Sequence, residues 1–278
     1  MKFTKMHGTG NDYIYVNGFV ESIDDPAAFA IKYSDRHKGI GSDGLVMIMP
    51  SDTSDFKMRM FNADGSESEM CGNASRCIAK YVFDKGLTNK TLISLETLAG
   101  VKMLRVFLNS DHKVEKVTVD MGAPVLDGLA IPTTFDSKTV VNKNVSFGNK
   151  IEYEITAVSM GNPHAVIYET NIADLNLPEI GPLIENSAVF PRRVNTEFIE
   201  IIRPDYIKMR VWERGSGETL ACGTGACAAV VAGVLNGRND RKTTVQLLGG
   251  ELEIEWNESD NHVYLTGGAN FVFEGEII

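Results

Sequence analysis

Short runs in which apolar and polar residues alternate dominate the chain, and this period of two predicts β-strands. The predicted strands lie at residues 12–16, 45–49, 57–62, 92–97, 102–108 and 114–120, and then at 153–158, 165–168, 196–202, 208–213, 243–247, 251–256, 262–267 and 270–278. Only residues 26–34, 74–85 and 225–236 are predicted as helices. So many strands with so few helices favour antiparallel sheets over repeated βαβ units.

The helix predicted at residues 225–236 is apolar on every face. Residues 226–235 read ACAAVVAGVL and contain no charged side chain. A helix of this kind is typically enclosed by protein, so we expect a sheet to wrap around it. It is well short of the roughly 20 apolar residues that span a bilayer, and no membrane segment is expected.

The chain repeats itself at a fixed interval. The segment KMRMF at residues 57–61 returns as KMRVW at residues 208–212, which is 151 positions later, and the same offset pairs Cys71 with Cys222. This predicts a duplicated domain, with one copy at residues 1–121, joined by the final strand 270–278, and the other at residues 122–269. The predicted fold class is α+β, with two pseudo-symmetric domains that each wrap antiparallel β-structure around a central helix.

Composition and charge narrow the classes of function. With 43% hydrophobic and 23% charged residues, the 278-residue chain has the composition of a globular protein. The net charge of −10 and the lack of runs of lysine and arginine argue against a nucleic-acid partner. The N-terminal residues MKFTKMHGTG lack the apolar core of a secretory signal, so we expect the protein in the cytoplasm.

Cys71 and Cys222 each stand directly before a predicted helix, whereas Cys77 and Cys227 fall inside these helices and are expected in the core. A helix N-terminus stabilises a nearby anion by about 0.3–1 kcal/mol, so we expect the pKa of each leading thiol to move from about 8.5 toward about 7.5. The spacings within each cysteine pair differ from the usual close pairs of zinc sites, so no metal is expected.

Two equivalent acid–base groups suit one particular chemistry. One group removes a proton from a carbon, the other returns a proton to the opposite face, and the stereocentre is inverted. Glu213 is suited to hold a substrate ammonium, and Arg214 a distal carboxylate. The sequence has no phosphate-binding P-loop, HExxH or dinucleotide-binding motif, so no cofactor is expected.

Several motifs, read in order, resemble those of the diaminopimelate epimerases. They are HGTGNDY at residues 7–13, GIGSDG at 39–44, FNADGSE at 61–67 leading to CGN at 71–73, GNPH at 161–164, RVN at 193–195, and ERGSGET at 213–219 leading to CGTG at 222–225. These cofactor-independent enzymes interconvert LL- and meso-2,6-diaminopimelate in lysine biosynthesis. The resemblance implies that the substrate lies in a cleft between the two domains, and it implies a homodimer with a contact near Phe273.

The resemblance also assigns roles to individual residues. Cys71 and Cys222 would be the catalytic pair, and His164 and Glu213 would adjust thiol ionisation. The expected substrate contacts are Asn11, Asn62, Gly72, Asn73, Asn162, Asn195, Glu213, Arg214, Gly223 and Thr224. One departure is Gly44, where many members of the family carry glutamine, so that a backbone group or water has to replace its contact.

Other functions remain open from the residues alone. A racemase of another amino acid could use the same scaffold, although proline racemases carry histidine where this chain has Asn73. A histidine racemase is harder to exclude. A third possibility is a thiol redox or metal-binding protein, in which the two cysteines form a disulfide or hold an ion.

Overall fold

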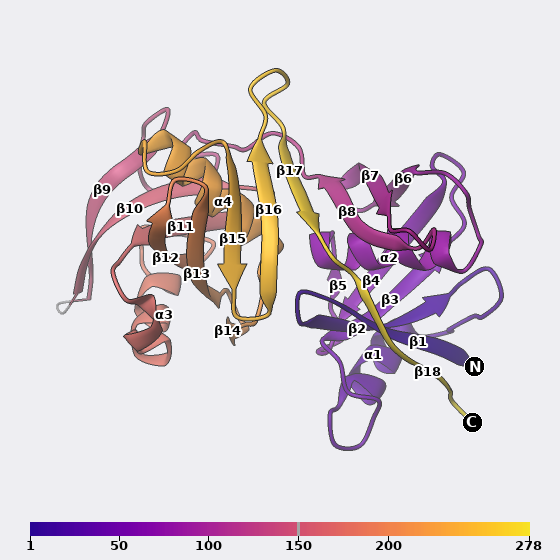
Figure 1. Ribbon diagram of the computed structural model, residues 1–278. Coiled ribbons are helices and arrows are strands. Elements are labelled where there is room, and N and C mark those ends of the chain that lie inside the picture. Colours follow the sequence, from indigo (N-terminus) through magenta and orange to yellow (C-terminus); the bar gives the residue numbers. More distant parts are fainter. Residues whose placement is uncertain (149–150) are drawn as a thin grey trace. The chain divides into compact units, whose positions relative to one another are not determined.

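The computed structural model describes residues 1–148 and 151–278, which divide into two compact units (Figure 1). The first unit comprises Met1–Asp120 and Thr266–Ile278, and the second comprises Met121–Leu265. Each unit contains strands together with two α-helices, so the predicted α+β class is confirmed.

The first unit is built from a mixed sheet and helices α1 and α2. Its strands pair in the order β18, β1, β2, β3, β4, β6, β7, β8, with the short β5 added to β4. The elements are β1 (Lys2–Gly8), β2 (Asn11–Asn17), α1 (Pro26–Ser34), β3 (Gly44–Met49), β4 (Phe56–Asn62), β5 (Glu67–Ser68), α2 (Gly72–Asp84), β6 (Leu92–Thr97), β7 (Gly100–Leu108), β8 (Val114–Asp120) and β18 (Asn270–Glu276).

The second unit repeats this arrangement. Its strands pair in the order β9, β10, β11, β12, β13, β15, β16, with β14 added to β13. The elements are β9 (Val140–Phe147), β10 (Ile151–Ser159), β11 (Pro163–Tyr168), the 3-10 helix η1 (Ile172–Asp174), α3 (Leu177–Glu185), β12 (Asn195–Arg203), β13 (Tyr206–Glu213), β14 (Gly217–Glu218), α4 (Gly223–Leu235), β15 (Lys242–Leu247), β16 (Gly250–Trp256) and β17 (Val263–Gly267).

The register of the strands confirms the internal repeat. Gly44 pairs with Asn62 in the first unit, and in the second unit Thr196 pairs with Trp212, which brings Asn195 opposite Glu213. Helices α2 and α4 begin and end at positions that differ by the same 151 residues as the sequence repeat.

Not every strand pair is antiparallel. β2 and β3 run parallel, as do β4 and β6, and the second unit has the matching parallel pairs β11–β12 and β13–β15. The expectation of antiparallel structure is therefore only partly right. The physical reason is that a helix lies between the two strands of each parallel pair and returns the chain to its starting end.

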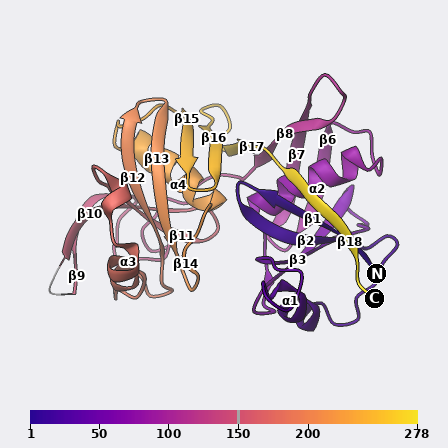
Figure 2. The same cartoon turned by 60° about the horizontal axis from the view of Figure 1, so that its bottom comes forward.

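Helices α2 and α4 lie at the centre of their units. Helix α4 contacts β10, β11, β12, β15 and β16, so strands from both ends of its sheet surround it. Ten of its residues are buried, as its uniform apolarity predicts. Helix α2 contacts β1, β2, β7 and β8 in the same way, and this packing can be followed in Figure 2.

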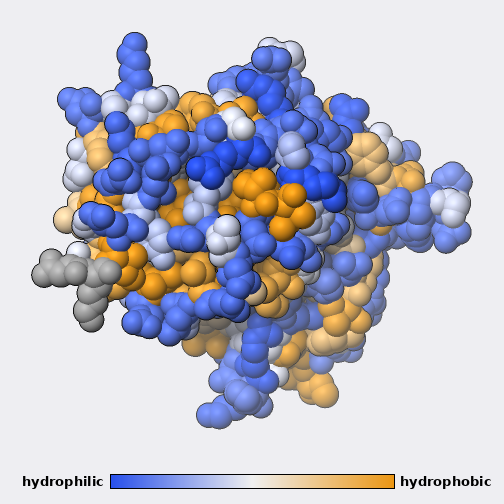
Figure 3. Space-filling view, turned by 60° about the vertical axis from the view of Figure 1, so that its left-hand side comes forward, coloured by the Kyte–Doolittle hydropathy of each residue, from blue (hydrophilic) through white to orange (hydrophobic). Residues whose placement is uncertain are grey.

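The face of the second unit that comes forward in Figure 3 is largely hydrophilic, with apolar residues in separate patches. Among the residues that the structure describes, no helix is long and apolar enough to cross a membrane.

Six elements were not predicted, namely the strands β1, β5, β9 and β14, the 3-10 helix η1 and the helix α3. Helix α3 contains Gly181 and Pro182, two residues that disfavour helix interiors. Gly181 is needed for packing, because a Cβ atom there would lie 2.3 Å from the Trp212 ring. Tertiary packing has overridden local propensity at this helix.

Gly233, inside α4, gives a test of how tightly this central helix is packed. A Cβ atom on Gly233 would lie 1.4 Å from Asn239 Oδ1, and Asn239 is buried and donates to Asp240 O at 2.8 Å. We expect Gly233→Ala to lower the free energy of unfolding by about 3 kcal/mol, from overpacking and loss of hydrogen bonds. Urea denaturation measures this loss.

Gly268→Ala is the matched control, because its nearest neighbour atom, Glu115 O, would be 4.0 Å from the new Cβ. We expect a change within about 0.5 kcal/mol in this control. Equal effects in the two variants would contradict the packing account.

Candidate active site

Cys71 and Cys222 occupy the same structural position in the two units. Each is the N-cap residue of a buried helix, Cys71 of α2 and Cys222 of α4, with extended backbone angles. Each Sγ accepts a hydrogen bond from a backbone N–H in the first turn, from Ala74 at 3.5 Å and from Gly225 at 3.4 Å. Gly72 and Gly223 are the first helical residues after them. Both thiols therefore lie at the positive end of a helix dipole.

A short hairpin positions each cysteine. β5 pairs with β4 just before Cys71, and β14 pairs with β13 just before Cys222. Ion pairs cross the two hairpins at matched positions, Arg59 to Glu67 at 2.8 Å and Arg210 to Glu218 at 2.7 Å. The repeated glutamates thus support the turns that lead to the thiols.

In the first unit, Cys71 lies in a cluster with Asn11, Asp43 and Asn73, which we call the Cys71 cluster. The thiol donates to Asn11 Oδ1 at 3.4 Å, and Asn73 Nδ2 donates to the same oxygen at 3.4 Å. Asn11 Nδ2 in turn donates to Asp43 Oδ2 at 2.7 Å. The Asn11 carboxamide is therefore fixed with its oxygen toward the thiol.

A network of charges holds Asp43 in place. Arg36 bridges Asp43 at 2.9 Å and Asp12 at 2.8 Å, and Asp12 also pairs with Lys5 at 2.5 Å. Burial raises the pKa of Asp12, but the hydrogen bonds from Arg36 and Lys5 outweigh it and hold the pKa below its usual value. The network holds both carboxylates in place behind Asn11.

In the second unit, Cys222 lies among His164, Glu197, Glu213 and Thr224, which together form the Cys222 cluster. The Cys222 thiol lies 3.5 Å from Thr224 Oγ1. Glu213 Oε1 accepts from Thr219 Oγ1 at 2.5 Å. Glu197 is fully buried, and its Oε1 lies 2.7 Å from His164 Nδ1.

The expectation of a lowered thiol pKa is wrong for Cys222. Burial, followed by the negative charges of Glu213 and Glu197, raises the pKa of Cys222 well above its ordinary value, although the bonds from Thr224 and Gly225 N–H oppose the rise. Burial likewise raises the pKa of Glu213. The helix dipole is outweighed here because two carboxylates and desolvation act on the same thiol.

Three further predicted contact residues already make hydrogen bonds within their own units. Asn195 is buried, donates to Pro163 O at 3.0 Å and accepts from Arg214 N at 2.9 Å. Arg214 donates through Nη1 to Arg192 O at 3.0 Å. Asn62 Nδ2 donates to Ser66 Oγ at 3.0 Å.

Gly44 lies where the repeat places Asn195 in the second unit. A Cβ atom on Gly44 would be 2.0 Å from Phe61 O, so this backbone has no room for a side chain. The first unit therefore offers no side-chain contact at the position where many members of the family carry glutamine.

Two site residues, Asp43 and Glu197, were missed in the sequence. Asp43 stands within the GIGSDG motif of residues 39–44. Its partner Asn11 is 32 positions away in the sequence, and only the fold brings the two side chains together. Glu197 lies inside the predicted strand 196–202, next to Phe198. Its repeat partner is Val46, so a comparison of the two copies would have singled it out.

The other two cysteines, Cys77 and Cys227, are fully buried, as predicted for core residues. Burial raises the pKa of Cys77 to about 11, which keeps it a thiol. Within residues 1–148 and 151–278, no group of three or more histidines, cysteines or carboxylates is placed to hold a metal ion.

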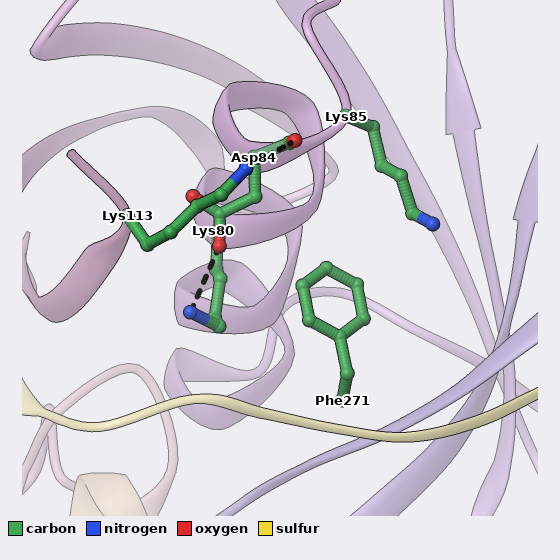
Figure 4. A pocket seen from close by; sticks show the side chains of 5 residues that line it. All are labelled: Lys80, Asp84, Lys85, Lys113 and Phe271. Carbon is green, nitrogen blue, oxygen red and sulfur yellow. Dashed lines mark hydrogen bonds and ion pairs between the residues drawn. The ribbon is translucent and has the colours of Figure 1, made fainter. Parts of the chain in front are cut away.

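A pocket of about 380 Å³ in the first unit lies apart from the Cys71 cluster (Figure 4). Its lining residues are Lys80, Asp84, Lys85, Lys113 and Phe271. Lys80 pairs with Asp84 at 2.9 Å, and Lys85 pairs with Glu274. The pocket adjoins the C-terminal end of α2, whereas Cys71 caps the N-terminal end of this 13-residue helix. It is therefore not part of the candidate site.

The raised pKa of Cys222 predicts how this thiol reacts. Only the thiolate is alkylated by iodoacetamide, so the pH midpoint for labelling Cys222 should lie above that of free cysteine. Because the Glu213 charge contributes to the shift, Glu213→Gln should move this midpoint to lower pH. Peptide mass spectrometry after timed labelling across a pH series measures both midpoints.

Glu253→Gln serves as the control, since Glu253 is an exposed strand residue paired with Lys242 at 3.0 Å. Its midpoint should equal that of the unmodified chain. A midpoint in Glu213→Gln that stays unchanged or rises would show that Glu213 does not act on this thiol through its charge.

Comparison with known proteins places the chain in a family. The family model for diaminopimelate epimerase matches residues 3–126 and 156–272. Diaminopimelate epimerase of Acetivibrio thermocellus is 60% identical over 277 residues, covering 100% of this chain and 98% of that protein. The enzyme of that name from Methanococcus maripaludis strain C6 is 57% identical over 277 residues, covering 100% and 99%.

A solved structure shares the fold at low sequence identity. The probable proline racemase from Agrobacterium radiobacter K84 is 15% identical in sequence and superposes with a TM-score of 0.72. The match covers 100% of this chain and 92% of that one. This likeness concerns the fold alone, whereas the family model and the two relatives extend over nearly all of the sequence. On this evidence the chain belongs to the diaminopimelate epimerase family.

Proposed function

We propose that the protein interconverts LL- and meso-2,6-diaminopimelate through two cysteine thiols, Cys71 and Cys222. The observation that carries the proposal is the matched placement of one N-capping thiol in each copy of the repeat. Full-length relatives named diaminopimelate epimerase support the substrate. The reaction is an isomerisation in lysine biosynthesis.

The chemistry requires one thiolate and one thiol at a time. The thiolate takes the α-proton, so the C–H bond breaks, an S–H bond forms and the electron pair stays on the α-carbon. The other thiol then gives its proton to the opposite face, and the configuration is inverted. The two thiols exchange roles in the reverse direction, so no external acid or base is consumed.

Substrate binding supplies a reason for one thiol to ionise. In the free protein, the Glu213 charge is one cause that raises the pKa of Cys222. A substrate ammonium bound at Glu213 would compensate that charge and lower the pKa of the thiol. The site would then gain its thiolate only when the amino acid is present.

The other predicted residues have roles that follow from their chemistry. The amides of Asn62, Asn73, Asn162 and Asn195 and the hydroxyl of Thr224 supply neutral donors, and Arg214 supplies a cation for a distal carboxylate. Gly72 and Gly223 are the first residues of α2 and α4, and the backbone N–H groups at a helix N-terminus bind anions. Residues of both units belong to this set.

The proposal includes the surroundings of the enzyme. We propose a cytoplasmic protein that needs no cofactor and acts as a homodimer. The exposed apolar residues Val272 and Phe273 on β18 support a contact there, since they are 54% and 46% exposed.

Loss of either thiol tests the reaction. We expect Cys71→Ala and Cys222→Ala each to reduce the interconversion of the LL and meso isomers by at least about 10³-fold, because each removes one of two required acid–base groups. Chiral chromatography of the product measures this loss. Cys77→Ala is the control and should keep most of the activity, since Cys77 is a buried core residue.

A panel of proline, hydroxyproline and histidine completes this experiment. Turnover of one of these amino acids without turnover of diaminopimelate would replace the proposed substrate. Full activity in either cysteine variant would contradict the two-thiol mechanism.

The proposed dimer contact predicts the effect of a charge on β18. We expect Phe273→Asp to convert the dimer to a monomer, because a buried unpaired carboxylate is unfavourable in an interface. Sedimentation velocity measures the mass. Leu129→Asp, at an exposed apolar residue of the second unit, should leave it unchanged. A Phe273→Asp dimer would rule out this contact.

A further inference from the structure

The buried pair of His164 and Glu197 has no counterpart in the first unit. His164 Nδ1 lies 2.7 Å from Glu197 Oε1, and both side chains are 0% exposed. The residues at the repeat positions in the first unit are Tyr13 and Val46. The first unit thus adopts the repeated fold without such a pair, so the fold itself does not require it.

The pair is also costly to keep. A buried carboxylate needs hydrogen bonds to offset its desolvation, yet Glu197 Oε2 has no hydrogen-bond partner among the described residues. A costly polar group at only one of two matched positions indicates a use other than packing.

The start of α4 is shaped around this carboxylate. A Cβ atom on Gly225 would lie 2.6 Å from Glu197 Oε1 and 3.2 Å from Cys222 Sγ. The repeat partner of Gly225 is Ala74, in the unit that has valine in place of Glu197. Glycine and glutamate therefore occur together in one unit, and alanine and valine in the other.

The hydrogen bonds fix where the protons of His164 are. His164 Nε2 lies 2.9 Å from Asn162 Oδ1, and a carboxamide oxygen only accepts, so Nε2 carries a proton. The other ring nitrogen, Nδ1, lies 2.7 Å from Glu197 Oε1. The contact with Glu197 thus orients the His164 ring, and the ring donates a hydrogen bond to the Asn162 carboxamide oxygen.

Asn162 and its repeat partner Asn11 are held in opposite ways. Asn11 donates its NH2 group to Asp43 and turns its oxygen to Cys71. Asn162 has its oxygen engaged by His164, which leaves its NH2 group to offer to a ligand. The two copies therefore present an acceptor in one unit and a donor in the other.

We propose that Glu197 is a positioning residue that acts through His164 to fix the Asn162 carboxamide, so that Asn162 donates to a carboxylate of the substrate. This inference rests on the proposed function only in taking an amino acid as the ligand. It assigns binding of the substrate, and not proton transfer, to the pair.

Two substitutions at position 197 separate positioning from charge. In Glu197→Gln the new NH2 group can donate to Nδ1, so Nε2 keeps its proton and the Asn162 oxygen stays engaged. In Glu197→Val, which copies Val46, the ring loses this partner. Both variants remove the Glu197 charge that acts on Cys222, so the contrast between them isolates positioning. We expect KM for diaminopimelate to be about tenfold higher in Glu197→Val than in Glu197→Gln, with the kcat values of the two variants within about threefold of each other.

The double variant Glu197→Val, Gly225→Ala copies the first unit's pair and controls for folding. It should show the same raised KM as Glu197→Val, with a Cβ atom filling the space left by the carboxylate. A fall in kcat at unchanged KM in both Glu197→Gln and Glu197→Val would overturn the proposal and make Glu197 a charge or proton carrier. Wild-type KM in Glu197→Val would also overturn it.

Nitrogen-15 NMR of histidine-labelled wild-type protein tests the same idea without any variant. The proposal requires a protonated Nε2 on His164 in the free protein, and an unprotonated Nε2 would overturn it. This measurement needs no substrate. If the wild-type protein failed to turn over diaminopimelate, the proposed function would fall, while the NMR result would still decide the arrangement of His164 and Asn162.

Discussion

The hydrogen bond from the first turn of a buried helix to a cysteine thiol is the constraint on which the site depends. The sheet of each unit encloses its central helix, so the helix N-terminus and the thiol before it have little freedom to move. A thiol held in this way is partly desolvated and lies at the positive end of the helix dipole. The hairpins before Cys71 and Cys222 and their Arg–Glu ion pairs support the same two positions.

Within this shared frame the two copies differ in electrostatics. The Cys71 cluster turns an amide oxygen to its thiol and is backed by the contacts of Arg36 with Asp43 and Asp12. The Cys222 cluster places Glu213 and Glu197 near its thiol, and both raise its pKa. The duplicated fold places the two thiols at equivalent positions, yet it surrounds them with different side chains. For an isomerisation, in which one group donates while the other accepts, such a difference is useful.

Much of this architecture could be read from the sequence. The offset of 151 positions predicted the matched helices α2 and α4. Helix α3 was hidden because Gly181 and Pro182 disfavour helix, and its formation depends on contact with Trp212. The pKa shift of Cys222 was predicted with the wrong sign, because the helix dipole can be read locally, whereas the burial of the thiol and the approach of Glu213 and Glu197 cannot. Asp43 was missed for the same reason, since its partner Asn11 comes from a different strand.

The isotope pattern at low conversion in D2O tests the two-thiol account most directly. In the proposed reaction the acid that protonates the inverted centre is a thiol in exchange with solvent, and the base that removed the proton lies on the other face. The account predicts that product formed from LL-diaminopimelate carries deuterium at the inverted carbon while the remaining substrate keeps its hydrogen. Product that retains the original hydrogen, returned by a single group, would contradict it.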